Sequence, residues 1–110
     1  MAAYAATVTS LMKRAVKVDA VTGIGMFAGK CDITNYNAVG AAITAIRGKF
    51  RTSGVISVIG GTAEGGNWVE WEDGTNSFKA YVSNATTGVT EEVADDVDVG
   101  EFDFVAYGLV

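Results

Sequence analysis

The sequence contains no histidine, no proline and a single cysteine among its 110 residues. Without histidine the chain lacks the side chain most often used for proton transfer near neutral pH, which is also the commonest metal ligand. A zinc site of the usual His/Cys kind is therefore almost excluded. Cys31 has no partner for an internal disulfide, as is usual for proteins made in the cytosol. These absences predict a non-catalytic protein without a cofactor.

Long apolar runs are also missing from the sequence. No stretch approaches the roughly 18 consecutive apolar residues of a membrane span, and the N-terminus has no basic region followed by an apolar segment. We therefore expect neither a secretory signal nor a membrane partner. A chain of 110 residues fits one domain, and its 14 glycines must supply most of the turns in place of proline.

The charges are segregated along the chain. Residues 1–51 carry seven basic residues and two acids, whereas residues 52–110 carry one lysine and eleven acids. This distribution predicts one basic and one acidic surface, unless strands from the two halves intermix in space and average the charge. A basic surface would suit an acidic lattice or another copy of the chain. Nucleic-acid binding is disfavoured because the net charge is −5 and the basic residues form no stripe interleaved with aromatics.

Alternating and β-branched runs, separated by turn residues, indicate an all-β chain. Six to eight short strands predict a β-sandwich or a jelly-roll-like small barrel with one short helix. Residues 15–19 suit a half-buried strand, and 54–59 are apolar on both faces, as in a central strand. The strongest hairpin signal joins 68–72 to 78–82. Further strands are expected at 26–33 and 102–110, and the helical segment at 41–47.

The first 14 residues differ from the rest in their weak alternation and high alanine content. Tyr4 and Val8 share one side of this segment, which suits an edge strand or an extended arm. We predict an N-terminal arm of residues 1–14 and a β-sandwich domain of residues 15–110. The arm would dock on a partner, and its removal would leave the domain folded.

Three local patterns suggest binding chemistry, and each has a simpler interpretation. Residues 23–28 fit a dinucleotide-binding fingerprint, but strand sequence follows where a helix is required. Gly29 and Lys30 suggest a phosphate loop whose other required residues are missing. The acidic run between Glu91 and Glu101 offers oxygen ligands for a cation without the order of a calcium loop, so a solvated loop is favoured.

Aromatic residues mark the expected hairpin. Trp68, Trp71, Phe78 and Tyr81 lie in its two strands and suit cross-strand pairs that fill the core. Trp68 and Trp71 have opposite parity, so they should face opposite sides of their strand. We expect one of them in the core and the other at an interface with a partner or another subunit.

Three stretches together resemble small structural proteins of tailed phages, of the capsid decoration or cement type. They are residues 32–44, the pair 69–72 and 78–81, and the pair 92–95 and 104–108. The resemblance covers about residues 30–110. It implies a β-sandwich or jelly-roll-like fold, a place in the virion and contact with the major capsid protein, and it implies no catalytic residue.

The expected function is therefore capsid decoration. The protein would be made in the host cytoplasm and would bind the outer capsid surface as trimers or other local clusters, bracing neighbouring capsid subunits. Alternatives are a head-to-tail connector or tail component, which the charge asymmetry would suit, and a host-recognition module of a fibre. The candidate interface residues are Tyr4, Val8, Lys13, Arg14, Lys17, Arg47, Lys49, Arg51, Trp68 and Trp71.

Overall fold

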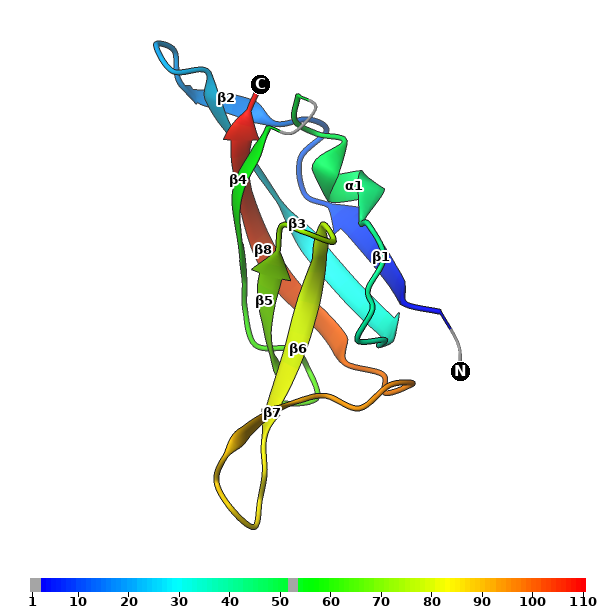
Figure 1. Ribbon diagram of the computed structural model, residues 1–110. Helices are drawn as coiled ribbons and strands as arrows, with labels where there is room; N and C mark the ends of the chain where they lie inside the picture. The colour runs from blue at the N-terminus through cyan, green and yellow to red at the C-terminus, as the bar shows by residue number, and fades with distance from the viewer. Residues whose placement is uncertain (1–2, 52–53) are drawn as a thin grey trace.

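A computed structural model describes residues 3–51 and 54–110 and contains two antiparallel β-sheets and a short helix (Figure 1). The predicted all-β, sandwich-like class with one short helix is confirmed. The larger sheet has the strand order β1-β3-β8-β4, with β2 also paired to β3, and the smaller has the order β5-β6-β7. The elements are β1 (Ala5–Ser10), β2 (Val16–Asp19), β3 (Ile24–Asn35), α1 (Thr44–Arg47), β4 (Val55–Gly60), β5 (Trp68–Glu72), β6 (Ser77–Ser83), β7 (Thr90–Glu92) and β8 (Gly100–Leu109).

Strands β3 and β8 form the centre of the larger sheet. They pair without interruption from Ile24 opposite Leu109 to Ile33 opposite Gly100. Since side chains alternate between the faces of a strand, one face of this pair is apolar and buried. It contributes Phe27, Cys31, Ile33, Phe102, Phe104 and Ala106 to the core. The sequence predicted both strands, and β3 extends beyond the expected bounds at each end.

The hairpin of β5 and β6 covers this buried face, and its prediction is confirmed. Val69 lies opposite Ala80, and Trp71 lies opposite Phe78. Phe78 is fully buried, and its ring centroid lies 4.8 Å from that of Phe102. This edge-to-face contact joins the two sheets at the middle of the core.

The N-terminal segment belongs to the sheet. The prediction of an arm over residues 1–14 is therefore wrong. Strand β1 pairs antiparallel with β3, from Ala6 opposite Ile33 to Ser10 opposite Gly29. Of the two interpretations of this segment, the edge strand is confirmed; weak alternation did not decide between them, because alanine supplies little apolar contrast with threonine. The domain therefore includes residues that were assigned to the arm, while residues 1 and 2 of the expected arm lie outside the described part of the chain.

Two strands lie where predicted but are buried differently. Strand β2 is predicted to be half-buried, yet all four of its residues are exposed. It pairs with the first residues of β3, from Ile24 to Met26, and this part of the larger sheet extends beyond the smaller sheet (Figure 1). Strand β4 was expected at the centre and buried on both faces. It is the last strand of the larger sheet, and Ile56 and Ile59 are exposed. The predicted helix at 41–47 is a single turn, α1.

The molecule is elongated, with principal extents of 49 × 27 × 24 Å. The β2–β3 turn lies at one end, and the loop between β6 and β7 lies at the other (Figure 1). No helix in residues 3–51 and 54–110 is long and apolar enough to cross a membrane.

Candidate interaction surfaces

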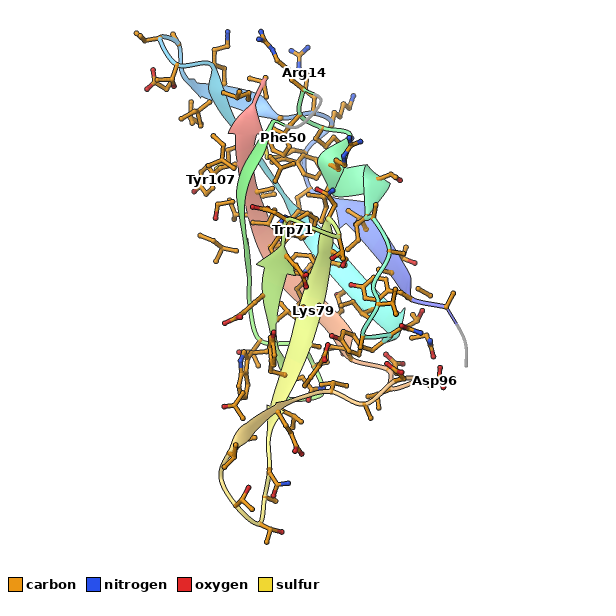
Figure 2. All side chains as sticks on the ribbon, viewed as in Figure 1. Arg14, Phe50, Trp71, Lys79, Asp96 and Tyr107 are labelled. Atoms are coloured by element: carbon orange, nitrogen blue, oxygen red, sulfur yellow. The ribbon has the colours of Figure 1, made fainter. Side chains whose placement is uncertain are left out.

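Basic side chains meet at the end of the molecule that carries β2. The connection from β1 to β2 holds Lys13 and Arg14, and Lys49 Nζ reaches across to donate a hydrogen bond to the Lys13 carbonyl at 3.4 Å. Lys17 and Arg51 line one hollow beside the C-terminus. We call these five residues the basic end. Figure 2 shows Arg14 there, at the top of the view.

The structure places the sixth basic candidate, Arg47, in a separate position. Its side chain lines a hollow with Val55, Asp73 and Asn76, near the turn between β5 and β6. Asp73, which lines the same hollow, partly offsets its charge. Arg47 is therefore not part of the basic end.

Acidic residues gather at the opposite end, on β7 and in the connection from β7 to β8. Several of them organise the local backbone. Asp95 accepts a hydrogen bond from the Ala38 N–H at 2.8 Å, and Asp98 accepts one from the Gly100 N–H at 3.0 Å. Asp96 accepts one from the side-chain amide of Asn35 at 3.3 Å. We call residues 91–98 the acidic end, and Figure 2 shows Asp96 there.

The acidic end does not gather its carboxylates around a common point. Glu92 accepts a hydrogen bond from the Tyr36 hydroxyl and lies 3.7 Å from Lys79 Nζ. Burial, followed by this hydrogen bond to Glu92, raises the pKa of Tyr36. Among the described residues, no three acidic or cysteine side chains are placed to hold a metal ion. The acids of residues 91–98 hold the loop through hydrogen bonds, and they give this part of the surface a negative charge.

The two tryptophans lie on opposite faces of β5, as their parity predicts. Trp71 faces the core, 5.0 Å from the Phe78 ring in an edge-on contact. Its indole Nε1–H is buried without an acceptor among the described residues. Trp68 faces outwards opposite Tyr81 and is half-buried. Trp68 is therefore the better interface candidate of the two.

Tyr4 and Val8, both predicted to contact a partner, pack against the protein's own core. The Tyr4 hydroxyl donates a hydrogen bond to the Phe78 carbonyl at 3.1 Å. Its ring lies 6.0 Å from that of Tyr36. Burial is the main cause of the raised pKa of Tyr4. Both side chains anchor this segment over the core, so β1 offers a partner its backbone edge and its outward face, where Thr7 and Thr9 are exposed.

A further surface, the outer face of the larger sheet, was missed by the sequence analysis. Two rows of apolar side chains cross it, as the strand pairing shows. Figure 2 shows Tyr107 projecting outwards from β8 on this side. Ile59 is 62% exposed. We call this surface the open face, and it consists of Val16, Met26 and Tyr107 in one row and Ala28, Val105 and Ile59 in the next.

A polar row borders the open face. Lys30 Nζ lies 2.7 Å from Asp103 Oδ1, and this hydrogen bond raises the pKa of Lys30. Both side chains are solvent-exposed, so the pair contributes little to stability. The apolar rows and this ion pair together have the composition seen at protein interfaces, with an apolar centre and a polar margin.

Alkaline pH is expected to destabilise the fold through Cys31. Burial, followed by the charge of Asp32, raises the pKa of this thiol from 9.0 to about 12. The unfolded chain therefore loses the thiol proton at lower pH than the folded chain does. The stabilising effect is complete below pH 9 and is lost as the pH rises towards 12.

Urea unfolding at pH 8 and pH 10.5 tests this effect in the wild type and in Cys31→Ala. The variant should lose less stability between the two pH values, because it lacks the thiol. The tyrosines contribute equally in both proteins. An equal loss in the two proteins would show that Cys31 has no part in the pH dependence.

Comparison with known proteins adds no relative to this description: the chain matches no protein-family model, no curated protein and no solved structure at a significant level.

Proposed function

We propose that this protein is a virion structural protein that binds the outer surface of the major capsid protein lattice and stabilises the head. The phage setting comes from the resemblance of residues 30–110 to capsid decoration proteins. The observation that supports a binding role is the open face. A small sandwich that leaves two apolar rows on one sheet uncovered has a surface suited to another protein.

Stabilisation of a capsid would follow from many modest contacts. Each copy would bury its open face on the lattice, and a copy that spans two capsid subunits would resist their separation. The basic end would steer the copy towards acidic parts of the shell and fix its orientation. Binding should therefore weaken as salt is added, because exposed charges are screened.

Co-sedimentation with empty capsids of the source phage tests the proposal. The wild type should pellet with capsids at a saturating stoichiometry, and Ile59→Lys should bind at least about tenfold more weakly, because it places a charge in an apolar interface. Val89→Lys is the matched control. It makes a comparable change at a residue that is also 62% exposed, in the loop before β7.

Equal binding by the two variants would remove the open face from the proposal. Absence of wild-type binding to capsids would contradict the decoration function itself. Both variants should be shown to melt near the wild-type temperature before binding is compared, so that a loss of binding is not a loss of folding.

A second candidate is a head-to-tail connector or tail component, and the two charged ends favour it. The basic end is at one end of the elongated molecule, and residues 91–98 lie in its other half, with Asp96 at the side (Figure 2). Copies stacked end to end would bring the basic end of one against the acidic end of the next, which is an arrangement that forms rings or filaments. Self-assembly into rings or tubes without capsids would favour this candidate.

A further inference from the structure

Strand β1 is an open edge of the larger sheet. The Leu11 N–H donates to the Ala28 carbonyl, and the register places Thr9 and Thr7 in the same phase as Leu11. In an antiparallel ladder the residues between them direct their N–H and C=O groups away from the neighbour. Ala6, Val8 and Ser10 therefore turn their backbone groups to the free edge.

The far side of β3 confirms this phase independently. The carbonyl of Ile33 accepts a hydrogen bond from the Val99 N–H, so it points away from β1. Ala6, which lies opposite Ile33, cannot bond with it and must present its polar groups outwards. Neither Ala6 nor Val8 has a backbone partner elsewhere in the described part of the chain.

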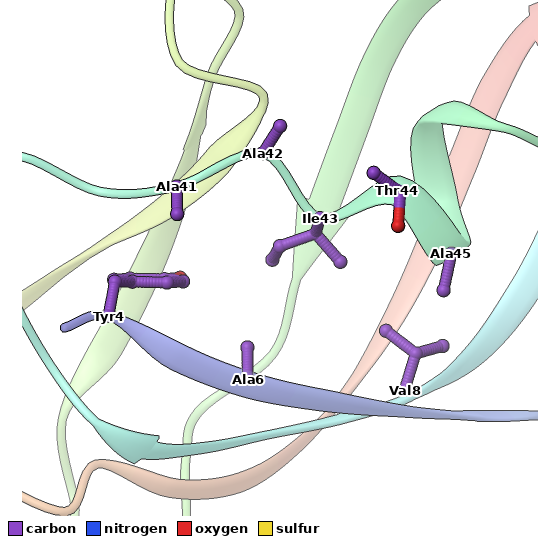
Figure 3. A pocket seen from close by; sticks show the side chains of 8 residues that line it. All are labelled: Tyr4, Ala6, Val8, Ala41, Ala42, Ile43, Thr44 and Ala45. Carbon is purple, nitrogen blue, oxygen red and sulfur yellow. The ribbon is translucent and has the colours of Figure 1, made fainter.

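Apart from one register shift at its start, this edge lacks the features that usually prevent strands from pairing with other chains. Natural edge strands carry charges, prolines or bulges that discourage pairing. Residues 3–12 contain no charged residue and no proline, and the one register shift lies between Ala5 and Ala6, at the start of the strand. The segment 41–45, which is mostly alanine, lies beside β1. Ala41, Ala42 and Ala45 line a hollow of about 150 Å³ with Tyr4, Ala6 and Val8 (Figure 3).

The charges around β1 favour a second copy of the same strand in the antiparallel direction. The Asn35 amide donates to the Ala3 carbonyl at 3.0 Å and to Asp96 at 3.3 Å, so an acid lies beside the start of β1. Lys13 and Arg14 follow its end. Antiparallel pairing of two copies would bring the start of each strand next to the end of the other. Asp96 of each copy would then lie near the partner's Arg14.

We propose that two copies of this chain associate edge to edge through β1, around a two-fold axis at Thr7. Ala6 lies opposite Val8 of the partner subunit, so the outward N–H and C=O groups of the two strands bond with one another. Thr7 lies opposite the partner's Thr7 in a pair without hydrogen bonds, where side chains are closest. The two five-stranded sheets become one continuous sheet. This interface uses the edge of the sheet and leaves the open face uncovered, so it does not rest on binding to capsids.

Sedimentation equilibrium of the isolated protein tests this pairing with variants at Thr7. The wild type should form a dimer of twice the 11.4 kDa chain mass. Thr7→Lys should raise the dissociation constant at least about tenfold, because two like charges then face each other across the axis. Thr7 is exposed and lies opposite Asp32, so a lysine there should fold. Ser57→Lys, on the opposite edge strand β4, should dimerise like the wild type.

A mixture of two oppositely charged variants tests whether Thr7 lies opposite the partner's Thr7. Thr7→Glu alone should also dissociate, and an equimolar mixture of Thr7→Lys and Thr7→Glu should recover the dimer. Arg14→Glu should weaken the dimer, and Arg51→Glu should leave it unchanged. A wild type that is monomeric up to about 1 mM would overturn the proposal. So would a dimer that Thr7→Lys does not weaken.

Discussion

Phe78→Ala is expected to lose about 3–5 kcal/mol of stability, which is a large part of what a domain of this size possesses. Phe78 is fully buried, and its ring contacts Trp71, Phe102 and Phe104. Removing it leaves a cavity between the two sheets at the point where they are joined. The surrounding aromatic rings are held by their own strands and cannot fill that space.

Tyr81→Ala is the matched control for Phe78→Ala. Tyr81 lies on the same strand three residues away, on the outward face opposite Trp68, and it is half-buried. Its loss should cost less than half as much as that of Phe78, measured by urea unfolding of both variants. Equal losses would mean that the core is not centred on the contact between β6 and β8.

Truncation of the chain to begin at Lys13 is expected to destabilise the whole domain by about 3 kcal/mol or more. It removes β1, which pairs with β3 along its length, and it removes Tyr4, Val8 and Met12, which pack against the core. Burial of each such side chain contributes up to roughly 1.5–3 kcal/mol when complete. It also exposes the edge of β3 and the buried thiol of Cys31, which lies opposite Val8.

A chain that begins at Tyr4 is the control for this truncation, because it retains β1 and the tyrosine that anchors it. The control should melt close to the full chain, while the chain that begins at Lys13 should melt far below it or fail to fold. Similar melting of the two truncated chains would restore the idea of a dispensable arm. Thermal unfolding followed by circular dichroism distinguishes these outcomes.

Much of the fold is predictable from local patterns. The β5–β6 hairpin has clean alternation on both strands and turn residues between them, so its pairing is specified by short-range sequence. The C-terminal strand β8 has the same clarity. The opposite parity of Trp68 and Trp71 also determines that they face opposite sides, although only the register with β6 reveals that Trp71 is the one that packs against the core.

Two of the errors, the place of β4 and the missed open face, have a common physical origin, because apolar composition does not say which element covers a face. Residues 55–59 are apolar on both sides, and a central position seemed the natural way to bury them. The strand lies instead at the sheet edge, with Ile56 and Ile59 exposed. Met26, Val105 and Tyr107 have the alternation of ordinary strand residues, so the open face could not be recognised until the smaller sheet was seen to cover the other side.

The candidate surfaces were predictable in part. The charge map indicated a basic surface, and the structure brings Lys13 to Lys49 and Lys17 to Arg51. The members of each pair are more than 30 positions apart in the sequence, so no local pattern shows that they lie near each other. Tyr4 and Val8 were predicted as partner contacts; their side chains pack against the protein's own core, which the weak alternation of this segment did not indicate.

Decoration of the capsid can be tested most directly by cryo-electron microscopy of empty capsids of the source phage saturated with this protein. The proposed function predicts added density in local clusters on the outer shell, with the open face against the major capsid protein and Ile59 and Tyr107 buried. Bare capsids, or copies bound with the open face towards solvent, would contradict it.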